Sequence, residues 1–413
     1  MNSQKKSEKL NILFITLKIP YPPYLDGGTL PTFMLIKHLA ARGHLIHLLC
    51  YNDTCCLPSD IADICETIHV IPLPFKPLAT IQKIGTHLSF RPGLINIYTT
   101  AGMVNEIHRV LSHYEIDVIH TNLLWMAKNT WRIKGYPKLV NAIDADSLYY
   151  YRNFRSEKHP LKKVFWLGEY FKTRYAESIL YPHFDVCSVV SATDKIHLSR
   201  FLRTVPIRVA PNGVDTQYFS PNGMAEEFPS LIFTGVMDYP PNSNGIIYFI
   251  QEILPHLKAH YPDLMLYIVG RRPTAELMRL ASKHIRVTGY VADLRHYLEK
   301  ASVYVCPLYS GTGIKNKLLE AMSMSKAIVA TPISIEGLPQ AINGQHVCIA
   351  ENRDIIIQKI IELLRSPERR RALGRNARNL MLREFSWQQT SCIFEKAYRE
   401  AIDRHHRQGV NAG

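Results

Sequence analysis

The chain alternates short apolar runs with longer segments of helical spacing, and it does so twice. Between residues 11 and 200 the apolar runs are rich in β-branched and aromatic residues, and each is bounded by polar or helix-like sequence. The same order restarts after the segment Asn212-Gly-Val-Asp215. Such alternation is typical of a parallel sheet covered by helices on both faces. We therefore predict an α/β chain with two doubly wound, Rossmann-like domains.

The length supports this division, because 413 residues exceed what one ordinary core contains. We predict an N-terminal domain over residues 1–205, a second domain over 206–385, and a C-terminal helix over 386–413 that returns towards the first domain. The expected strands lie at residues 11–17, 45–51, 68–73, 117–121, 139–143 and 186–191, then at 230–234, 264–269, 285–288, 303–307, 327–330 and 347–349. We expect a helix over 30–42, ended by Gly43, and a surface helix pair over 354–405 interrupted at Ser386-Trp387. Doubly wound sheets bind ligands at the carboxyl ends of their strands, so two facing domains would form a cleft.

Composition limits the classes of partner. The chain is 46% hydrophobic and carries a net charge of +14, which indicates a folded protein attracted to something anionic. A nucleic-acid partner is disfavoured, because the cations are dispersed and no binding module is recognisable.

Cysteines and hydropathy indicate the compartment. The eight cysteines show no Cys-x-x-Cys spacing and lie mostly in apolar runs, which indicates buried thiols in a reducing compartment and no metal site. No run approaches the roughly 20 apolar residues of a membrane span, and the lysine-rich start has no signal core behind it. We expect a cytoplasmic protein.

One segment joins a glycine turn to a helix with a carboxylate. Gly311-Thr-Gly-Ile-Lys-Asn-Lys-Leu-Leu-Glu-Ala-Met322 follows the buried run Val303–Leu308. Its apolar residues recur at helical spacing, so Thr312, Asn316 and Glu320 fall on the opposite face. A helix N-terminus favours a diphosphate, and a carboxylate two turns further along accepts from ribose hydroxyls. The segment therefore predicts a nucleotide site, although an amphipathic helix after a glycine turn is the plain alternative.

Several motifs together resemble one family. They are Asp26-Gly-Gly28, Ala210-Pro-Asn-Gly-Val-Asp215, Phe233-Thr-Gly235, Ile268-Val-Gly270, Val287-Thr-Gly-Tyr-Val291 and Gly311–Met322. In order and spacing they resemble retaining glycosyltransferases of the GT-B fold, family four, and in particular bacterial exopolysaccharide sugar transferases. The resemblance implies a nucleotide-diphosphate sugar as donor, a glycan or lipid-linked acceptor, and no cofactor or metal.

Carried over by position, the resemblance assigns the donor site. Glu320 would bind the ribose, and amides around Gly313 and Ile314 would hold the diphosphate. The rest of the donor-binding set is Gly27, Gly28, Gly235, Gly270, Arg271, Tyr290, Val291, Gly311, Thr312, Lys315 and Asn316. Gly27 and Gly28 would let the amino-terminal loop approach the donor without a Cβ in the way.

The chain departs from the family pattern at three places. Thr312 stands where relatives have a second glutamate, and Val236-Met-Asp stands where many have an arginine and a lysine after the glycine. We expect Lys317 to supply the missing charge, ahead of Lys315 or Arg271, with a solvated helix lysine as the alternative. These departures also motivate a second functional hypothesis, a catalytically silent scaffold subunit of a polysaccharide-assembly complex.

The third departure is in the amino-terminal half. Family members often have a histidine after the strand that corresponds to residues 138–143, whereas this chain has Asp144-Ala-Asp146. We expect Asp144 or Asp146 to hold the donor sugar or orient the acceptor hydroxyl, with Asp144 favoured because it ends the strand. Two alternatives stay open: Asp146 as a helix N-cap, or the pair as the metal-binding Asp-x-Asp of GT-A enzymes.

The acceptor side is indicated only by a basic, aromatic stretch. Residues 149–174 mix tyrosine, phenylalanine and tryptophan with lysine and arginine. Such a surface suits peripheral contact with the anionic inner face of the cell membrane, and inward-packed aromatics with outward lysines are the alternative.

Overall fold

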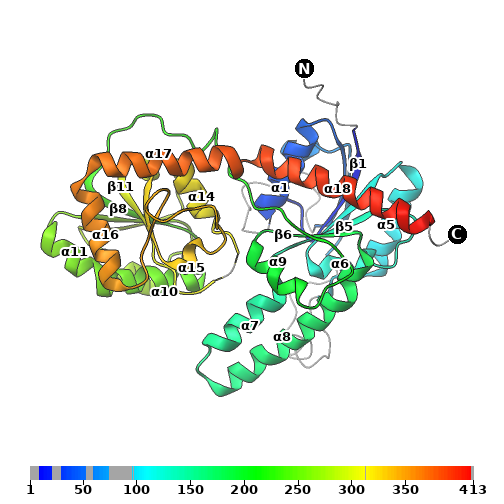
Figure 1. Ribbon diagram of the computed structural model, residues 1–413, viewed down its shortest axis with the longest axis horizontal. Helices are drawn as coiled ribbons and strands as arrows, with labels where there is room; N and C mark the ends of the chain where they lie inside the picture. Colours follow the sequence, from blue (N-terminus) through cyan, green and yellow to red (C-terminus); the bar gives the residue numbers. More distant parts are fainter. Residues whose placement is uncertain are drawn as a thin grey trace. The chain divides into compact units, whose positions relative to one another are not determined.

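The computed structural model describes residues 9–20, 29–52, 59–73, 95, 97–311 and 313–410. The chain divides into two compact units (Figure 1). The first contains residues 1–211 and 390–413, and the second contains residues 212–389. The predicted α/β class with two parallel, doubly wound sheets is confirmed.

The first unit contains a seven-stranded parallel sheet in the order β3-β2-β1-β4-β5-β6-β7. Its strands are β1 (Asn11–Thr16), β2 (Leu45–Tyr51), β3 (Thr67–Ile71), β4 (Val118–Asn122), β5 (Lys138–Ile143), β6 (Val186–Val189) and β7 (Ile207–Val209). Strand β7 was not predicted, because three residues are too few to show a period. The strand order reverses between β1 and β4, and the carboxyl ends beside such a switch point are where these sheets bind ligands.

Helices cover both faces of this sheet. They are α1 (Thr29–Ala41), α2 (Ser59–Ala62), α5 (Ala101–His113), α6 (Leu124–Thr130), α7 (Asp146–Ser156), α8 (Pro160–Leu180), the 3-10 turn η1 (Tyr181–His183), α9 (Ala192–Ser199) and the later part of α18 (Trp387–Val410). Leu13 and Ile15 of β1 pack with Met103 and Ile107 of α5. On the other face of β1, Phe14 stacks on His120, whose ring contacts Tyr398 of α18. The C-terminal helix thus completes the first unit, as the sequence predicted.

The second unit contains a six-stranded parallel sheet in the order β10-β9-β8-β11-β12-β13. Its strands are β8 (Glu227–Thr234), β9 (Met265–Val269), β10 (Ile285–Gly289), β11 (Ala301–Cys306), β12 (Ala327–Ala330) and β13 (Cys348–Ile349). Its helices are α10 (Pro240–Tyr248), η2 (Phe249–Ile253), α11 (Leu254–His260), α12 (Ala275–Arg279), α13 (Arg295–Lys300), α14 (Asn316–Ser323), α15 (Pro332–Ile335), α16 (Arg353–Arg365) and α17 (Pro367–Glu384). Apolar side chains of strands and helices form one continuous core.

The expected C-terminal helix pair is wrong: the structure has three helices there. Ser366 ends α16, and its Oγ accepts a hydrogen bond from Arg369 N at 3.2 Å to cap α17, with Pro367 in the first turn. Serine followed by proline is a common helix start, so the sequence contained this signal. Helices α16 and α17 are also part of the core, since Ile360 and Ala377 are fully buried. None of the described helices is both long and apolar enough to span a bilayer.

Candidate active site

The glycine loop after β11 leads directly into α14. Gly311 and Gly313 have φ angles of +117° and +66°, the left-handed region that glycine tolerates. Lys315 is the N-cap, but its ammonium group can only donate and so cannot cap the amides of the first turn; its Nζ donates to Gly313 O at 2.8 Å. The first turn of α14 therefore has no side-chain cap and its amides favour an anion. The helix begins at Asn316, two residues later than the pattern indicates, and Thr312 lies outside the described residues.

A second loop, which contains Gly337, packs closely against the glycine loop at Gly313 and Ile314. Gly337 follows α15, and a Cβ placed there would lie 2.9 Å from Ile314 Cα and 3.0 Å from Gly313 O. Only a glycine permits this approach without a shift of the backbone. The segment after β12 therefore fixes the position of the glycine loop.

Lys317 does not project into solvent. Its side chain is partly buried, its Nζ donates to Asn242 Oδ1, and it lies 4.6 Å from the centroid of the Phe233 ring. Burial lowers the pKa of Lys317 to about 8. The alternative of a solvated helix lysine is therefore wrong. The ammonium lies beside the carboxyl end of β8.

Glu320 lies one turn further along α14. Burial raises the pKa of its carboxyl group to about 7, and the positive charge of Lys317 opposes that rise. The carboxyl group makes no hydrogen bond with any residue that the structure describes. Such a group is available to a ligand with hydroxyl donors.

Two glycine loops meet next to Lys317. Gly235 follows β8 and Gly270 follows β9, and a Cβ at Gly270 would lie only 1.7 Å from Gly235 O. Met237 N donates to Arg271 O at 3.0 Å, which joins the two loops. A Cβ at Gly235 would lie 3.3 Å from Lys317 Nζ. The structure thus brings Gly235, Gly270 and Lys317 together.

The other predicted donor-site residues of this unit differ in their exposure and contacts. Tyr290 is 74% exposed, whereas Val291 packs against the core. Arg271 is half-buried after β9, and Asn316 accepts a hydrogen bond from Asn212 at 3.1 Å. Gly27 and Gly28 lie outside the described residues.

In the first unit, two backbone outliers lie side by side at the carboxyl edge. Leu123 follows β4 with φ +70°, and Ile143 ends β5 with φ +66°. Leu123 N donates to Asn141 O at 2.8 Å, so the two positions lie on neighbouring strands. A left-handed conformation costs a bulky residue about 1–3 kcal/mol, and such strain clusters at functional sites. Sequence reasoning missed both, because neither residue type favours this conformation.

The strained Ile143 is followed directly by the two predicted aspartates. Asp144 is half-buried, and Asp146 is the first residue of α7. The N-cap is Ala145, so the interpretation of Asp146 as an N-cap is wrong. Asp146 Oδ2 is buried and has no hydrogen-bond partner among the described residues. Burial raises the pKa of Asp146 well above its usual value, and the carboxyl groups of Glu177, Asp144 and Asp194 raise it further.

A buried network holds the first turn of α7. Ser147 Oγ donates to Glu177 Oε2 at 2.5 Å and lies 2.8 Å from His197 Nε2. Burial raises the pKa of Glu177 to about 7 and lowers that of His197 to about 4. Ala145 N donates to Asp194 Oδ1 at 3.0 Å. These partners come from α8 and α9, so no spacing near Asp146 could reveal them.

A second polar network crosses the sheet beside this edge. His120 Nδ1 lies 2.8 Å from Tyr398 Oη, and its Nε2 lies 3.0 Å from Asn122 Oδ1. Since that oxygen only accepts, Nε2 carries the proton and Nδ1 accepts from the tyrosine. Asn122 Oδ1 also accepts from Asn141 Nδ2 at 2.9 Å. A histidine and an asparagine two residues apart within an apolar strand are a signal that could have predicted this network.

Among the residues that the structure describes, no group of histidine, cysteine, aspartate and glutamate is arranged to hold a metal ion. The two doubly wound sheets also differ from the single-domain fold on which the Asp-x-Asp alternative depends.

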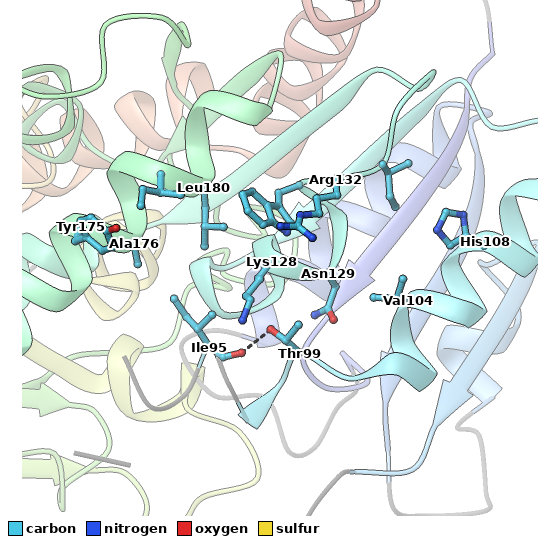
Figure 2. Close-up of a pocket in the computed structure, with 13 residues that line it drawn as sticks. Ile95, Thr99, Val104, His108, Lys128, Asn129, Arg132, Tyr175, Ala176 and Leu180 are labelled. Carbon is cyan, nitrogen blue, oxygen red and sulfur yellow. Dashed lines mark hydrogen bonds between the residues drawn. The ribbon is translucent and has the colours of Figure 1, made fainter. Parts of the chain in front are cut away.

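A cavity of about 520 Å³ lies elsewhere in the first unit, between α5, α6 and α8 (Figure 2). Its lining is mostly apolar and includes Ile95, Trp131 and Leu180, with Lys128 and Arg132 among them. Trp131 and Arg132 precede β5, so this part of the lining is remote from the carboxyl edge that carries Asp144. We do not associate the cavity with the candidate active site.

Two family models match successive parts of the chain. The model described as Glycosyltransferase Family 4 matches residues 27–218, and the model described as Glycosyl transferases group 1 matches residues 228–366. Between them they include the candidate residues of both units.

Relatives and solved structures agree with these matches. An uncharacterized 44.6 kDa protein in the cps region of Klebsiella pneumoniae is 20% identical over 94% of this chain and 99% of its own length. A phosphatidyl-myo-inositol mannosyltransferase of Mycolicibacterium smegmatis is 31% identical, over 30% of this chain and 33% of its own length. Sucrose-phosphate synthase from Thermosynechococcus elongatus superposes with a TM-score of 0.71 at 18% identity, over 96% of this chain and all of that chain. Anabaena HepE, solved with UDP and glucose, superposes with a TM-score of 0.65 at 13% identity, over 94% of this chain and 99% of that chain.

Proposed function

The chain belongs to the group 1, family 4 glycosyltransferases, enzymes that transfer a sugar from a nucleotide sugar, and from this premise we propose what it transfers and to what. The proposed donor is a nucleotide-diphosphate hexose. The proposed acceptor is a glycan or lipid-linked glycan of the cell surface, at the cytoplasmic face of the membrane. The mannosyltransferase relative and the neighbour solved with UDP and glucose support the donor, and the relative from a capsule region supports the acceptor.

One observation carries the proposal: on one short helix, α14 presents an N-terminus without a side-chain cap, a partly buried lysine and a carboxyl group free of described partners. In the proposed complex the amides after Gly313 hold the diphosphate and Glu320 accepts from the ribose hydroxyls. Lys317 neutralises the charge that develops on the departing nucleotide diphosphate. These groups act most strongly where charge develops, so they stabilise the transition state more than the bound donor.

The proposal assigns contact with the hydroxyl groups of the sugar to the segment Asp144-Ala-Asp146. Its support is the strained Ile143 before it and the buried, unpartnered Oδ2 of Asp146. We propose retention at the anomeric carbon, by front-face attack in which the departing phosphate oxygen takes the acceptor proton, without a metal ion. In this mechanism the aspartates orient sugar hydroxyls and do not attack the anomeric carbon.

The position of Lys317 weakens the hypothesis of a silent scaffold. That hypothesis rested partly on the missing arginine and lysine after Gly235. Lys317 Nζ lies 3.3 Å from where a Gly235 Cβ would be, so α14 supplies a cation at the same loop.

The test is release of nucleotide diphosphate. Purified protein is incubated with bacterial membranes and a panel of UDP- and GDP-hexoses, and we expect release with at least one donor. No release with any donor, at enzyme levels at which a known transferase registers, would favour the scaffold.

Donor binding tests the site itself. Glu320→Ala should weaken donor binding by roughly 1–3 kcal/mol, the scale of losing a charged acceptor, with the fold intact. The matched control is Glu276→Ala on α12, an exposed glutamate of the same unit, which should bind the donor like the wild type. An unchanged dissociation constant for Glu320→Ala would refute the ribose assignment.

A further inference from the structure

Helices α7 and α8 form a hairpin that extends from the sheet of the first unit (Figure 1). Helix α7 starts directly after the carboxyl end of β5, and α8 returns antiparallel to it. The 11 residues of α7 span about 16 Å at 1.5 Å per residue. The turn between the helices therefore lies about 16 Å beyond the edge that carries Asp144 and Asp146.

One face of α8, which we call its inner face, is buried against the rest of the first unit. Its buried residues recur at helical spacing: Glu169, Thr173, Ala176, Glu177 and Leu180. An ordinary surface helix would carry polar residues on the opposite face.

The outward side of α8 is instead apolar and exposed, and at its C-terminal end Tyr175 and Ile179 also line the cavity between α5, α6 and α8. We call this side the outer stripe, and it consists of Leu161 (75% exposed), Val164 (70%), Phe165 (40%), Phe171 (58%), Tyr175 (61%) and Ile179 (37%). Gly168 lies within the stripe, and a Cβ placed there would meet no atom within 4 Å. Single exposed apolar residues are ordinary, but a contiguous stripe marks an interaction surface.

The tip of the hairpin is strongly basic. Residues 152–165 contain five lysines and arginines and one carboxylate, Glu157. Glu157 Oε1 accepts hydrogen bonds from the backbone amides of Lys158 and His159, both at 2.9 Å, so this carboxylate stabilises the turn between the two helices. Lys158, Lys162 and Lys163 are exposed around the start of the stripe. The partner of this surface must be anionic as well as apolar.

We propose that the outer stripe of α8 inserts into the surface of an anionic lipid bilayer, with the lysines of the hairpin tip at the headgroups. Apolar side chains flanked by lysines are the composition that binds such surfaces. Pairing with a second copy through the same tips would bring two basic clusters together, which a bilayer avoids because its charge is opposite. The choice of a bilayer rests on the proposed lipid-linked acceptor.

The experiment is flotation of the full-length chain with vesicles of phosphatidylglycerol and phosphatidylcholine, compared with phosphatidylcholine alone. The variant Leu161→Gln, Val164→Gln, Phe171→Gln removes the stripe at exposed positions. The control Ile196→Gln, Met278→Gln, Ile342→Gln removes three apolar side chains that are 59%, 47% and 54% exposed outside the hairpin. Circular dichroism confirms that each variant is folded.

We expect the wild type and the control to float with anionic vesicles. The stripe variant should bind roughly tenfold or more weakly, because apolar burial sets the strength of such binding. Lys158→Gln, Lys162→Gln, Lys163→Gln should bind anionic vesicles more weakly as well, and high salt should remove most of the remaining advantage of anionic over neutral vesicles.

Three outcomes would overturn the proposal. The first is that the wild type does not bind anionic vesicles at low salt, and the second is that the stripe variant binds them equally well. The third is that the wild type sediments as a dimer and the stripe variant as a monomer, which would assign the stripe to a second copy. Donor binding without vesicles is measured in parallel, so that failure of docking leaves the transferase assignment standing, and failure of donor binding leaves docking standing.

Discussion

Lys317 and Glu320 have pKa values that approach each other from opposite sides. Burial lowers that of Lys317 to about 8 and raises that of Glu320 to about 7, although each charge favours the other. Burial is the larger effect because the two side chains do not bond to each other: Lys317 donates to Asn242 instead. Both groups are charged together only in a narrow interval near neutral pH. A dianionic diphosphate and ribose hydroxyls would stabilise that doubly charged state.

This pair predicts a bell-shaped pH dependence of donor binding. Below about pH 7 the free protein has a protonated Glu320, which accepts poorly from ribose, and above about pH 8 it has a neutral Lys317. Affinity for a nucleotide sugar, measured by calorimetry, should fall by up to roughly tenfold per pH unit on either side. A nucleotide sugar is the right ligand, because its diphosphate has no ionisation in this interval.

Variants at the two positions test the acid and the alkaline limb of this pH profile separately. Glu320→Gln should abolish the acid limb and leave the alkaline one, and Lys317→Met should do the reverse. If both variants kept both limbs, the titrating groups would lie elsewhere and the assignment would be wrong.

At the scale of elements, the loops after β8 and β9 form one structural piece. A Cβ at Gly270 would lie 1.7 Å from Gly235 O, and Gly270 has φ +152°. Gly270→Ala must therefore push the two loops apart, next to Lys317. We expect a loss of stability of about 1–3 kcal/mol and donor binding weakened by more than that loss explains.

The control is another glycine with a positive φ. Gly344 has φ +78° but no atom within 4 Å of its Cβ position. Gly344→Ala should show the conformational cost without the change in donor binding. Equal effects of both variants on donor affinity, measured at a temperature where both are folded, would mean that the loop contact does not shape the site.

Elements with a clear period were predictable, and the rest depended on distant partners. Twelve of the described strands follow from apolar runs in the sequence, among them β1 and β11, because a buried parallel strand must be apolar on both faces. Strand β7 was missed because it has only three residues, whereas the break at Ser366 was missed although its serine and proline are a local signal for a helix start. The two glycine loops and α14 were found because helix starts and tight turns have local signals.

The candidate residues of the first unit were predictable only in part. Asp144 and Asp146 follow a strand and could be found, but their surroundings could not. Glu177, Asp194 and His197 come from later helices, and the left-handed φ of Ile143 opposes its intrinsic preference. Such strain exists only because the surrounding structure imposes it, so a local pattern cannot predict it.

At the scale of the whole molecule, the chain returns to its first unit to complete it. Residues from Thr390 onward belong with residues 1–211. Helix α18 contributes Glu395, which accepts from Arg42 Nε at 2.8 Å and lies 2.7 Å from His44 Nε2. Since His44 Nδ1 accepts from Leu10 N at 3.1 Å, Nε2 carries the proton and donates to the carboxylate. One carboxylate thus joins the start, the α1 region and the end of the chain.

Removing that carboxylate should destabilise the first unit selectively. Glu395 is 7% exposed, and Glu395→Gln keeps its size but loses its charge-assisted bonds. We expect a loss of about 1–3 kcal/mol in the unfolding of this unit, followed by urea denaturation. Glu400→Gln on the same helix is the control: it breaks a pair with Arg208, whose side chain is 45% exposed, and should cost under about 1 kcal/mol.

The dependence on pH gives the sharper test of this contact. Burial raises the pKa of Glu395, but the hydrogen bonds from Arg42 and His44 outweigh burial and leave it below its usual 4.5. A carboxyl group with a depressed pKa contributes stability above its unfolded value and loses that contribution as the pH falls through its folded value. The difference in free energy of unfolding between the wild type and Glu395→Gln should therefore be largest at pH 6 to 7 and shrink steadily below about pH 4.5. A difference that stayed constant into acid would show that packing, and not the charge of Glu395, joins the C-terminal helix to the first unit.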